Sequence, residues 1–342
     1  MQKTMDAKLA DIRSNPNSNA FIIAYAADSD MSRGIPSAGQ RHPINPKKPD
    51  AYVTMQEYHE DLEAIVEKGD IDILLASVGT MDVLAHEKQI FRDSLVTPAI
   101  RANDTTDIWG ARGSSYREFP SRPFATTTIE EAQYGTLTPN PGQAPAVNLG
   151  LYSATFNNDL ERDLETLERF KDFRINATKK GFLYFLEVFN PNAQGAAIAP
   201  EDIPNFVNDH ICRMLAGIPR SSRPEFLKIA YNSPASMEAL VNYDTSVVVG
   251  ILGGPASTTY DAYKLIYEAK KYGARLTLFG RRIKDAEDSL AFTKILRQVA
   301  ADTISPEEAV KAYHGALQKQ GIKPKRDLET DMVLHTPALL ES

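Results

Sequence analysis

The sequence predicts an α/β protein built as a single (β/α)8 barrel of the TIM type, and three observations lead to it. Short apolar runs recur eight times along the 342-residue chain. Most are followed by a turn and then by a stretch with helical spacing, which is typical of parallel βαβ units. Eight such units over roughly 280 residues fit a closed barrel, whereas an open doubly wound sheet usually has fewer strands. We therefore expect one domain over 1–342, with a barrel core at about 20–300 and a C-terminal helical extension and tail at 301–342.

The individual elements follow in chain order from the apolar runs and the periodicity between them. Strands are expected at 20–27, 71–77, 96–102, 144–153, 182–190, 225–231, 246–252 and 274–280. Helices are expected at 55–69, 81–93, 159–181, 200–217, 257–273, 284–300 and 305–319. The first helix illustrates the reasoning, because MQEYHEDLEAIVEKG is amphipathic at helical spacing and stops at a glycine.

Two long segments without regular periodicity follow the first and third strands. Residues 29–52 are polar and rich in proline, and residues 103–144 are rich in Gly, Pro, Ser, Thr and Arg. The loops that follow the strands of a barrel surround its active-site face. We therefore expect both segments to form lids that exclude water from that face.

Composition excludes several classes of protein. A hydrophobic content of 42% with 24% charged residues is typical of a soluble globular chain. The net charge of −7, without a basic stripe, gives no reason to expect a nucleic-acid partner. No run of about 18 apolar residues and no signal-peptide core occurs, so we expect no membrane partner and a cytoplasmic location. The single cysteine, Cys212, fits a reducing compartment and is expected to be a small core residue.

The segment SVVVGILGGPASTTYDAYKLI, residues 246–266, has the shape of a phosphate-binding loop: a buried strand, a glycine turn and a helix. A dinucleotide fingerprint needs G-x-G-x-x-G, and Gly250, Gly253 and Gly254 do not have that spacing. A P-loop needs Lys and Ser or Thr after its last glycine, but here Pro255 follows. The remaining possibility is the anion site of a barrel, formed by backbone N–H groups in the loops after strands seven and eight.

Both of those loops carry residues suited to an anion. Gly253 and Gly254 end the seventh predicted strand, and Gly280 and Arg281 end the eighth. Glycine lets an oxyanion approach the backbone amides, the hydroxyls of 257–259 add donors and an N-cap, and arginine offers a planar fork. The alternative for either loop is a tight turn with a solvated arginine. Two such endings on neighbouring strands favour anion binding.

Lys228 stands inside the apolar strand EFLKIAYNS, with Leu227 and Ile229 on the opposite face by alternation. Burying an ammonium is costly, so a lysine at this place needs a reason. One reason is snorkelling or a carboxylate partner. The other is chemistry, because desolvation favours the neutral amine, which can attack a carbonyl and form a Schiff base.

The neighbouring strand has a matching feature. Glu187 is the one acid in FLYFLEVFN, and it is either the ion-pair partner of Lys228 or a group that transfers protons. The first strand ends in AYAADSD, so that Asp28 or Asp30 faces the same mouth, with a solvated loop acid as the alternative, above all for Asp30. A carboxylate, a lysine and an anion cradle at successive strand ends form a coherent candidate site.

Together these residues resemble the class I, Schiff-base-forming aldolases of the barrel superfamily. Residues from about 181 to 283 are similar to the archaeal-type fructose-bisphosphate aldolases and the tagatose-bisphosphate aldolases. That family carries its imine-forming lysine on strand six, where KIAY places Lys228. The tagatose-type enzymes carry a catalytic glutamate in L-E-P on strand five, where FLEVF places Glu187. The strand-one aspartate of the family falls on Asp28 of AYAAD.

The same resemblance assigns substrate-binding positions. The phosphate loops of the family fall on Gly253, Gly254, Gly280 and Arg281. Tagatose-type relatives carry a lysine on strand four, where AVNLGL offers Asn148 instead. We include Asn148 and Arg101, which ends the third predicted strand, among the substrate-binding candidates.

The resemblance implies a metal-independent class I aldolase, a lyase that acts on a ketose or ketose phosphate through an imine on Lys228. Glu187 would shuttle protons, and Asp28 would orient a substrate hydroxyl or assist. No cofactor is implied, and the six histidines form no H-x-x-H or H-E-x-x-H cluster that would hold a metal. We expect a sugar or sugar phosphate as the small-molecule partner and a homo-oligomer. An isomerase or transaldolase-like enzyme at the same site, and a non-catalytic or regulatory sugar-phosphate-binding barrel, stay open as alternatives.

Overall fold

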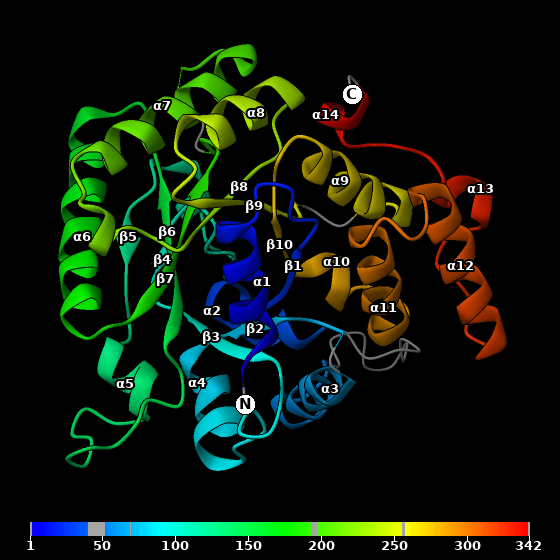
Figure 1. Cartoon of the computed structure of the whole chain (residues 1–342), viewed down its shortest axis with the longest axis horizontal. Coiled ribbons are helices and arrows are strands. Elements are labelled where there is room, and N and C mark those ends of the chain that lie inside the picture. The colour runs from blue at the N-terminus through cyan, green and yellow to red at the C-terminus, as the bar shows by residue number, and fades with distance from the viewer. Residues whose placement is uncertain (1, 40–51, 69, 193–196, 255–256, 341–342) are drawn as a thin grey trace.

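Eight parallel strands close into a barrel, which confirms the predicted fold class (Figure 1). The structure is a computed structural model that describes residues 2–39, 52–68, 70–192, 197–254 and 257–340. The strand order around the barrel is β1-β2-β3-β6-β7-β8-β9-β10, and β10 pairs with β1. The bounds are Ile22–Ala27 (β1), Ile73–Ala76 (β2), Thr97–Arg101 (β3), Leu149–Thr155 (β6), Leu183–Phe189 (β7), Phe226–Ile229 (β8), Val248–Leu252 (β9) and Leu276–Phe279 (β10). Each predicted strand overlaps one of these strands.

Helices cover the outside of the barrel (Figure 1). The longer ones are Thr4–Ser14 (α1), Met55–Lys68 (α3), Leu160–Lys179 (α6), Ile203–Ala216 (α7), Pro234–Tyr243 (α8), Thr259–Lys271 (α9), Ser289–Ala300 (α11) and Pro306–Lys319 (α12). The short ones are Asp30–Arg33 (α2), Val78–Met81 (α4), Ile129–Tyr134 (α5), Arg281–Lys284 (α10), Leu328–Asp331 (α13) and Pro337–Leu340 (α14). The helix α12, which begins the C-terminal extension, packs on α9 and α11. Among the described helices, none has the length and apolar character needed to cross a membrane.

Three local predictions need correction. The helix expected at 81–93 is a single α-helical turn, α4, followed by a π-helical segment at Asp82–Glu87. The segment 103–144 is not structureless, because β4 (Asp104–Thr105) pairs antiparallel with β5 (Pro123–Phe124), and α5 follows them. The helix α8 was not predicted, although Ser233 caps it and Pro234 begins it, a combination typical of a helix start.

The helix α1, also absent from the predicted elements, closes the amino-terminal end of the barrel. Met5 and Leu9 of α1 pack in the same apolar cluster as the inward side chains of the strands. The ammonium of Lys8 donates to the carbonyl oxygen of Phe21, directly before β1, and forms an ion pair of 2.7 Å with Asp72, directly before β2. The helix α1 thus covers the amino-terminal end of the barrel, and the opposite end, at the carboxyl ends of the strands, is where barrel enzymes hold their sites.

Replacing Asp72 by asparagine should lower the free energy of unfolding by about 3 kcal/mol, because it breaks a buried charge network. Asp72 is fully buried, accepts a hydrogen bond from the Ile23 amide at 2.8 Å, and forms ion pairs with Lys8 and, at 3.3 Å, with Arg297 of α11. Urea unfolding at pH 7 measures the change. The matched control is Glu63→Gln, which removes a partly exposed ion pair with Lys88 and should cost less than about 1 kcal/mol. Equal losses in the two variants would contradict this role for Asp72.

Candidate active site

Strand register brings a row of polar side chains together inside the barrel. Neighbouring strands pair Ser153 with Glu187, Glu187 with Lys228, and Lys228 with Gly250. Below this row, toward the amino-terminal end, Phe185 and Phe226 stack inside the barrel with ring centroids 4.6 Å apart. Because side chains alternate along a strand, Glu187 and Lys228 point inward like the two phenylalanines. The apolar layer therefore forms the floor under the polar row.

Lys228 and Glu187 form a buried pair at the centre of this row. The Lys228 ammonium nitrogen lies 2.6 Å from Oε1 of Glu187, and only 6% of Lys228 and 1% of Glu187 are exposed. The structure thus brings together the two residues that the sequence placed on neighbouring strands. At this distance, a proton can pass from the amine to the carboxylate and leave the amine free to act as a nucleophile.

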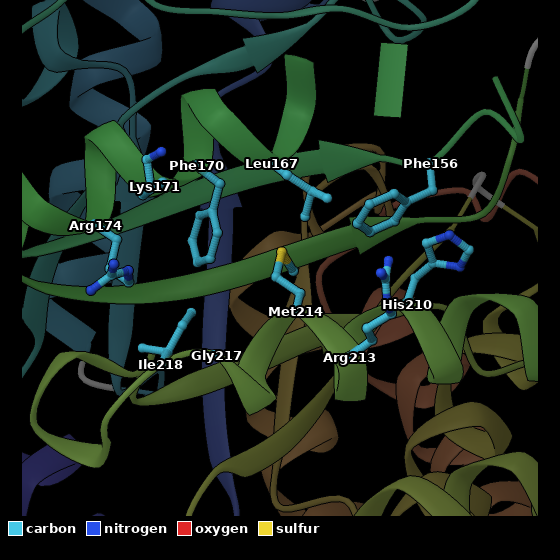
Figure 2. Close-up of a pocket in the computed structure, with 10 residues that line it drawn as sticks. All are labelled: Phe156, Leu167, Phe170, Lys171, Arg174, His210, Arg213, Met214, Gly217 and Ile218. Atoms are coloured by element: carbon cyan, nitrogen blue, oxygen red, sulfur yellow. The ribbon is translucent and has the colours of Figure 1, made fainter. Parts of the chain in front are cut away.

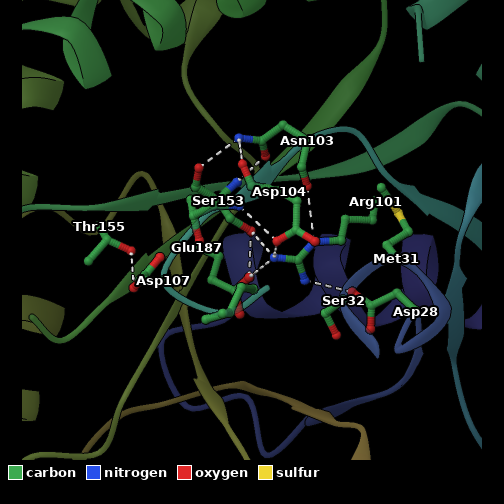
Figure 3. A network of polar contacts seen from close by, with 12 residues as sticks. Asp28, Met31, Ser32, Arg101, Asn103, Asp104, Asp107, Ser153, Thr155 and Glu187 are labelled. Atoms are coloured by element: carbon green, nitrogen blue, oxygen red, sulfur yellow. Dashed lines mark hydrogen bonds and ion pairs between the residues drawn. The ribbon is translucent and has the colours of Figure 1, made fainter. Parts of the chain in front are cut away.

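Arg101, at the carboxyl end of β3, joins the pair to two aspartates (Figure 3). Its guanidinium donates to Oδ2 of Asp28 at 2.7 Å and to Oγ of Ser153 at 2.9 Å, and it lies 3.3 Å from Asp104 and 3.6 Å from Glu187. Arg101 is buried, and most of its N–H groups donate to partners among the described residues. In the structure Arg101 therefore holds the carboxylates of the site in place. The sequence had suggested a different role for it, as a residue that binds the substrate.

Asp28 lies in this cluster, as the sequence predicted for the end of the first strand. Burial alone would raise the pKa of Asp28, but the positive charges of Arg101 and Lys228 and the hydrogen bond from Arg101 outweigh burial. The pKa of Asp28 is therefore held below its usual value. Asp30 points elsewhere, since its carboxylate accepts a hydrogen bond from Ser77 of the neighbouring strand end. Burial raises the pKa of Asp30.

Three residues of the cluster were not predicted. Ser153 donates to Oε2 of Glu187 at 2.6 Å while it accepts from Arg101, and the Asn103 side chain pairs with the backbone of Ser153. Asp104 is 1% exposed, and its Oδ2 has no hydrogen-bond partner among the described residues. Burial raises the pKa of Asp104 to about 6, against the opposing charge of Arg101. The polar pair Asn103–Asp104 directly after a buried strand was the available sequence signal.

The raised pKa of Asp104 predicts a specific pH dependence of stability. The folded protein keeps a proton on Asp104 up to about pH 6, whereas an unfolded chain loses it near pH 4. This group therefore stabilises the fold most below pH 4, and its contribution falls as pH rises from about 4 to 6, by roughly 3 kcal/mol at most. Asp104→Asn resembles the protonated acid, so the stability difference between the variant and the natural chain should grow across that window in urea titrations. Parallel curves for the two proteins from pH 4 to 7 would contradict the raised pKa.

The glycines of the predicted anion cradle lie at the carboxyl ends of β9 and β10. A side chain at Gly253 would lie 2.9 Å from Phe279, and one at Gly280 would lie 2.8 Å from the carbonyl oxygen of Ala26, so neither position has room for one. Gly254 has a φ of +65°, which glycine adopts without strain. Gly253 and Gly280 therefore allow neighbouring strand ends to approach closely. Residues 255–256 of this loop lie outside the described residues.

The polar groups around this cradle differ in part from the prediction. Thr258 caps α9 as expected, but the hydroxyls of Ser257 and Thr258 both donate to Asp261 and are not free for a ligand. Arg281 is exposed, and partial desolvation, followed by the nearby charges of Arg33 and Arg117, lowers its pKa. Arg282, which the sequence did not single out, donates through Nε to the carbonyl oxygen of Gly253.

Asn148 does not belong to this site. It precedes β6 at the amino-terminal end of the barrel, where its side chain donates to the carbonyl oxygen of Gly181 at 2.9 Å and accepts from Gln133 at 2.8 Å. Five positions along an extended strand separate it from Ser153, which is about 17 Å. The assignment of Asn148 as a substrate-binding residue is therefore wrong, and Ser153 is the residue that β6 contributes to the cluster.

The two segments expected to act as lids contact each other beside the mouth. The amide of Gly110, in the segment after β3, donates to the carbonyl oxygen of Ser32, in the segment after β1, at 2.7 Å. The guanidinium of Arg117 lies against Gly110 and donates to the carbonyl oxygen of Ile108. Residues 40–51 of the first segment lie outside the described residues. Closure of these segments over a ligand stays a prediction.

Comparison with known proteins agrees with the fold. No family model and no curated protein matches the chain. A Schiff-base-forming fructose-1,6-bisphosphate aldolase superposes with a TM-score of 0.59 and 18% identity, over 87% of this chain and 100% of that chain. An archaeal fructose 1,6-bisphosphate aldolase gives 0.59 and 19% over the same shares, and the fructose-bisphosphate aldolase of Slackia heliotrinireducens DSM 20476 gives 0.62 and 12% over 97% and 94%. At these identities the likeness shows the barrel fold.

Proposed function

We propose that the protein is a class I aldolase that makes or breaks a carbon–carbon bond in a ketose or ketose phosphate through an imine on Lys228. One observation carries this proposal. The amine of Lys228 lies inside the mouth of the barrel, above an apolar floor, 2.6 Å from a carboxylate that can take its proton. A buried lysine beside a proton acceptor is the arrangement that imine chemistry requires.

The chemistry follows from this pair. Glu187 takes a proton from Lys228, and the free amine attacks the ketone carbon to give a carbinolamine. Glu187 then returns the proton to the departing hydroxyl, water leaves, and a cationic iminium forms. The iminium accepts the electron pair of the bond between the α and β carbons when a base removes the β-hydroxyl proton. An aldehyde leaves, and protonation and hydrolysis of the remaining enamine release the second product and the amine.

The Arg101 cluster has a supporting role in this scheme. Arg101 and Ser153 hold one oxygen of Glu187 and leave the other facing Lys228. Asp28, kept ionised by Arg101 and Lys228, is available to orient a substrate hydroxyl or to accept its proton. The amides of Gly253, Gly254 and Gly280, together with Arg281, would hold a phosphate or another anionic end of the substrate.

Reductive trapping tests the proposal. Borohydride reduces an imine to a stable amine, so the enzyme should lose activity irreversibly when borohydride and a true ketose substrate are present together. A panel of phosphorylated and unphosphorylated ketoses would identify the substrate class. Borohydride without ketose is the control and should leave activity intact. If no ketose in the panel gives inactivation, the imine proposal fails.

A second candidate function is a sugar-phosphate-binding barrel without catalysis. The observation that favours it is that Lys228 already has a charge partner in Glu187 and needs no substrate to satisfy it. Such a protein would bind a sugar phosphate in calorimetry without giving a trapped adduct. An isomerase would also give no trapped adduct on Lys228, but it would turn its substrate over. A transaldolase-like enzyme would give a trapped adduct and would need an acceptor aldehyde for turnover.

A further inference from the structure

A cavity lies between α6 and α7 (Figure 2). Its volume is about 330 Å³. The apolar side chains that line it are Phe156, Leu167, Phe170, Met214 and Ile218. Its basic side chains come from both helices, and the described residues that line it include no acidic one. A hollow of this kind is suited to an apolar group that is flanked by negative charge.

The helix α6 presents an apolar stripe beside this cavity. Leu160 is 77% exposed, Leu164 is 52% exposed and Ile175 is 38% exposed. Positions three and four apart share a face of a helix, so Leu160 and Leu164 form one line with Leu167, which lines the cavity. The helix lies at the outer edge of the molecule (Figure 1). Large exposed leucines in a row beside an open apolar cavity indicate a surface that another protein covers.

The charges of α6 are segregated along its length. The acidic residues of its first half are Glu161, Asp163, Glu165 and Glu168. The basic residues of its second half are Arg169, Lys171, Arg174 and Lys179. Arg162 and Asp172 are the two exceptions. A helix with this pattern is complementary to itself when two copies run antiparallel, and such a contact has the two-fold symmetry of the commonest oligomers.

We propose that two copies of this chain form a dimer in which the α6 helices pack antiparallel about a two-fold axis near Leu167. In this arrangement Leu164 of each copy enters the cavity of the other, and Leu160 of each copy packs on Ile175 of the other. Arg174 then lies beside Glu161 across the axis. This single contact would bury the exposed leucines of α6, fill the cavity and place opposite charges of the two helices side by side.

The dimensions are adequate for such a dimer. A 20-residue helix is about 30 Å long, and α6 and α7 side by side give a face of roughly 600 Å² per copy. Two such faces bury about 1,200 Å², which is the lower limit for a specific interface. The dimer should therefore dissociate when a single central contact is disturbed.

Sedimentation velocity of the natural chain and two variants tests the proposal. The natural chain should be a dimer at tens of micromolar, and Leu164→Asp should weaken its association at least tenfold. The control is Leu137→Asp, which places the same charge at a leucine that is 60% exposed in the loop after α5 and should not change association. Circular dichroism verifies that both variants are folded. A natural chain that stays monomeric, or a dimer that Leu164→Asp leaves unchanged, would overturn the proposal.

A charge exchange tests the antiparallel geometry independently. Arg174→Glu should weaken the dimer, because Glu161 of the other copy then faces a like charge. Adding Glu161→Arg to the same chain should restore association, since both symmetric contacts regain opposite charges. If the double variant is as weak as the single one, the two helices do not run antiparallel with this register, and the proposed geometry is wrong.

Discussion

Lys228→Met should abolish carbon–carbon bond cleavage while the barrel stays folded. Methionine keeps most of the apolar stem of lysine, and Glu187 keeps its hydrogen bond from Ser153 and the nearby charge of Arg101. Without the amine no iminium forms, so we expect kcat to fall on the order of 10⁴-fold or more, as for other covalent nucleophiles. Steady-state assays with the substrate identified by trapping measure the loss, and thermal unfolding verifies the fold.

The matched control for this variant is Lys88→Met. Lys88 also forms an ion pair with a glutamate, Glu63, but both side chains are partly exposed and lie outside the site. The activity of Lys88→Met should stay within about twofold of that of the natural chain, because exposed ion pairs contribute little to stability. If Lys228→Met instead unfolds, Lys228 is mainly a structural member of the buried ion-pair cluster. If the variant folds and stays active, the nucleophile lies elsewhere.

Glu187→Gln should lower kcat by about 10²–10⁴-fold, because it removes the group that exchanges protons with Lys228 and with the carbinolamine hydroxyl. The glutamine carbonyl oxygen can still accept from Ser153, so the shape of the cluster should be kept. The loss should fall on kcat more than on KM. Trapping by borohydride should also become slower at a fixed substrate concentration.

Glu60→Gln provides the control for this change of charge. Glu60 lies on α3, where it accepts a hydrogen bond from Gln56 at the exposed surface, and the substitution should leave kcat unchanged. If Glu187→Gln keeps full activity, then Asp28, which is also paired with Arg101 and is kept ionised there, becomes the candidate for proton transfer. If Glu187→Gln loses the fold, its role is structural.

The adjacency of Lys228 and Glu187 could be predicted from the sequence because it depends on two simple regularities. Side chains alternate along a strand, and parallel βαβ units place consecutive strands side by side. A lone charge in each of two consecutive apolar strands therefore faces the same interior. The eight strands and the closed barrel follow from the same local patterns.

The rest of the cluster depends on contacts that local patterns do not encode. Arg101, Asp104 and Ser153 come from β3, β4 and β6, and they meet through the register between strands and the course of the segment after β3. The error at Asn148 has the same origin. The fourth strand was expected to begin at residue 144, but β6 begins at Leu149, and the shift moves Asn148 from mid-strand to the amino-terminal end.

The helix α1 also could not be predicted from local sequence patterns. It has only a few apolar residues. Met5, Leu9 and Ile12 pack against the end of the barrel, a contact that the local sequence does not predict. Its contact with Asp72 joins residues 64 positions apart. The exposed leucines of α6 likewise became evident only from the structure, which shows that Leu160 and Leu164 are exposed in a single copy.

Imine catalysis requires that the side-chain nitrogen of Lys228 become covalently attached to the substrate. The measurement is peptide mass spectrometry after borohydride reduction with the ketose that inactivates the enzyme. We expect the mass of one reduced ketose on the peptide that contains Lys228, and none in Lys228→Met. An adduct on another lysine, or full turnover without any adduct, would contradict it.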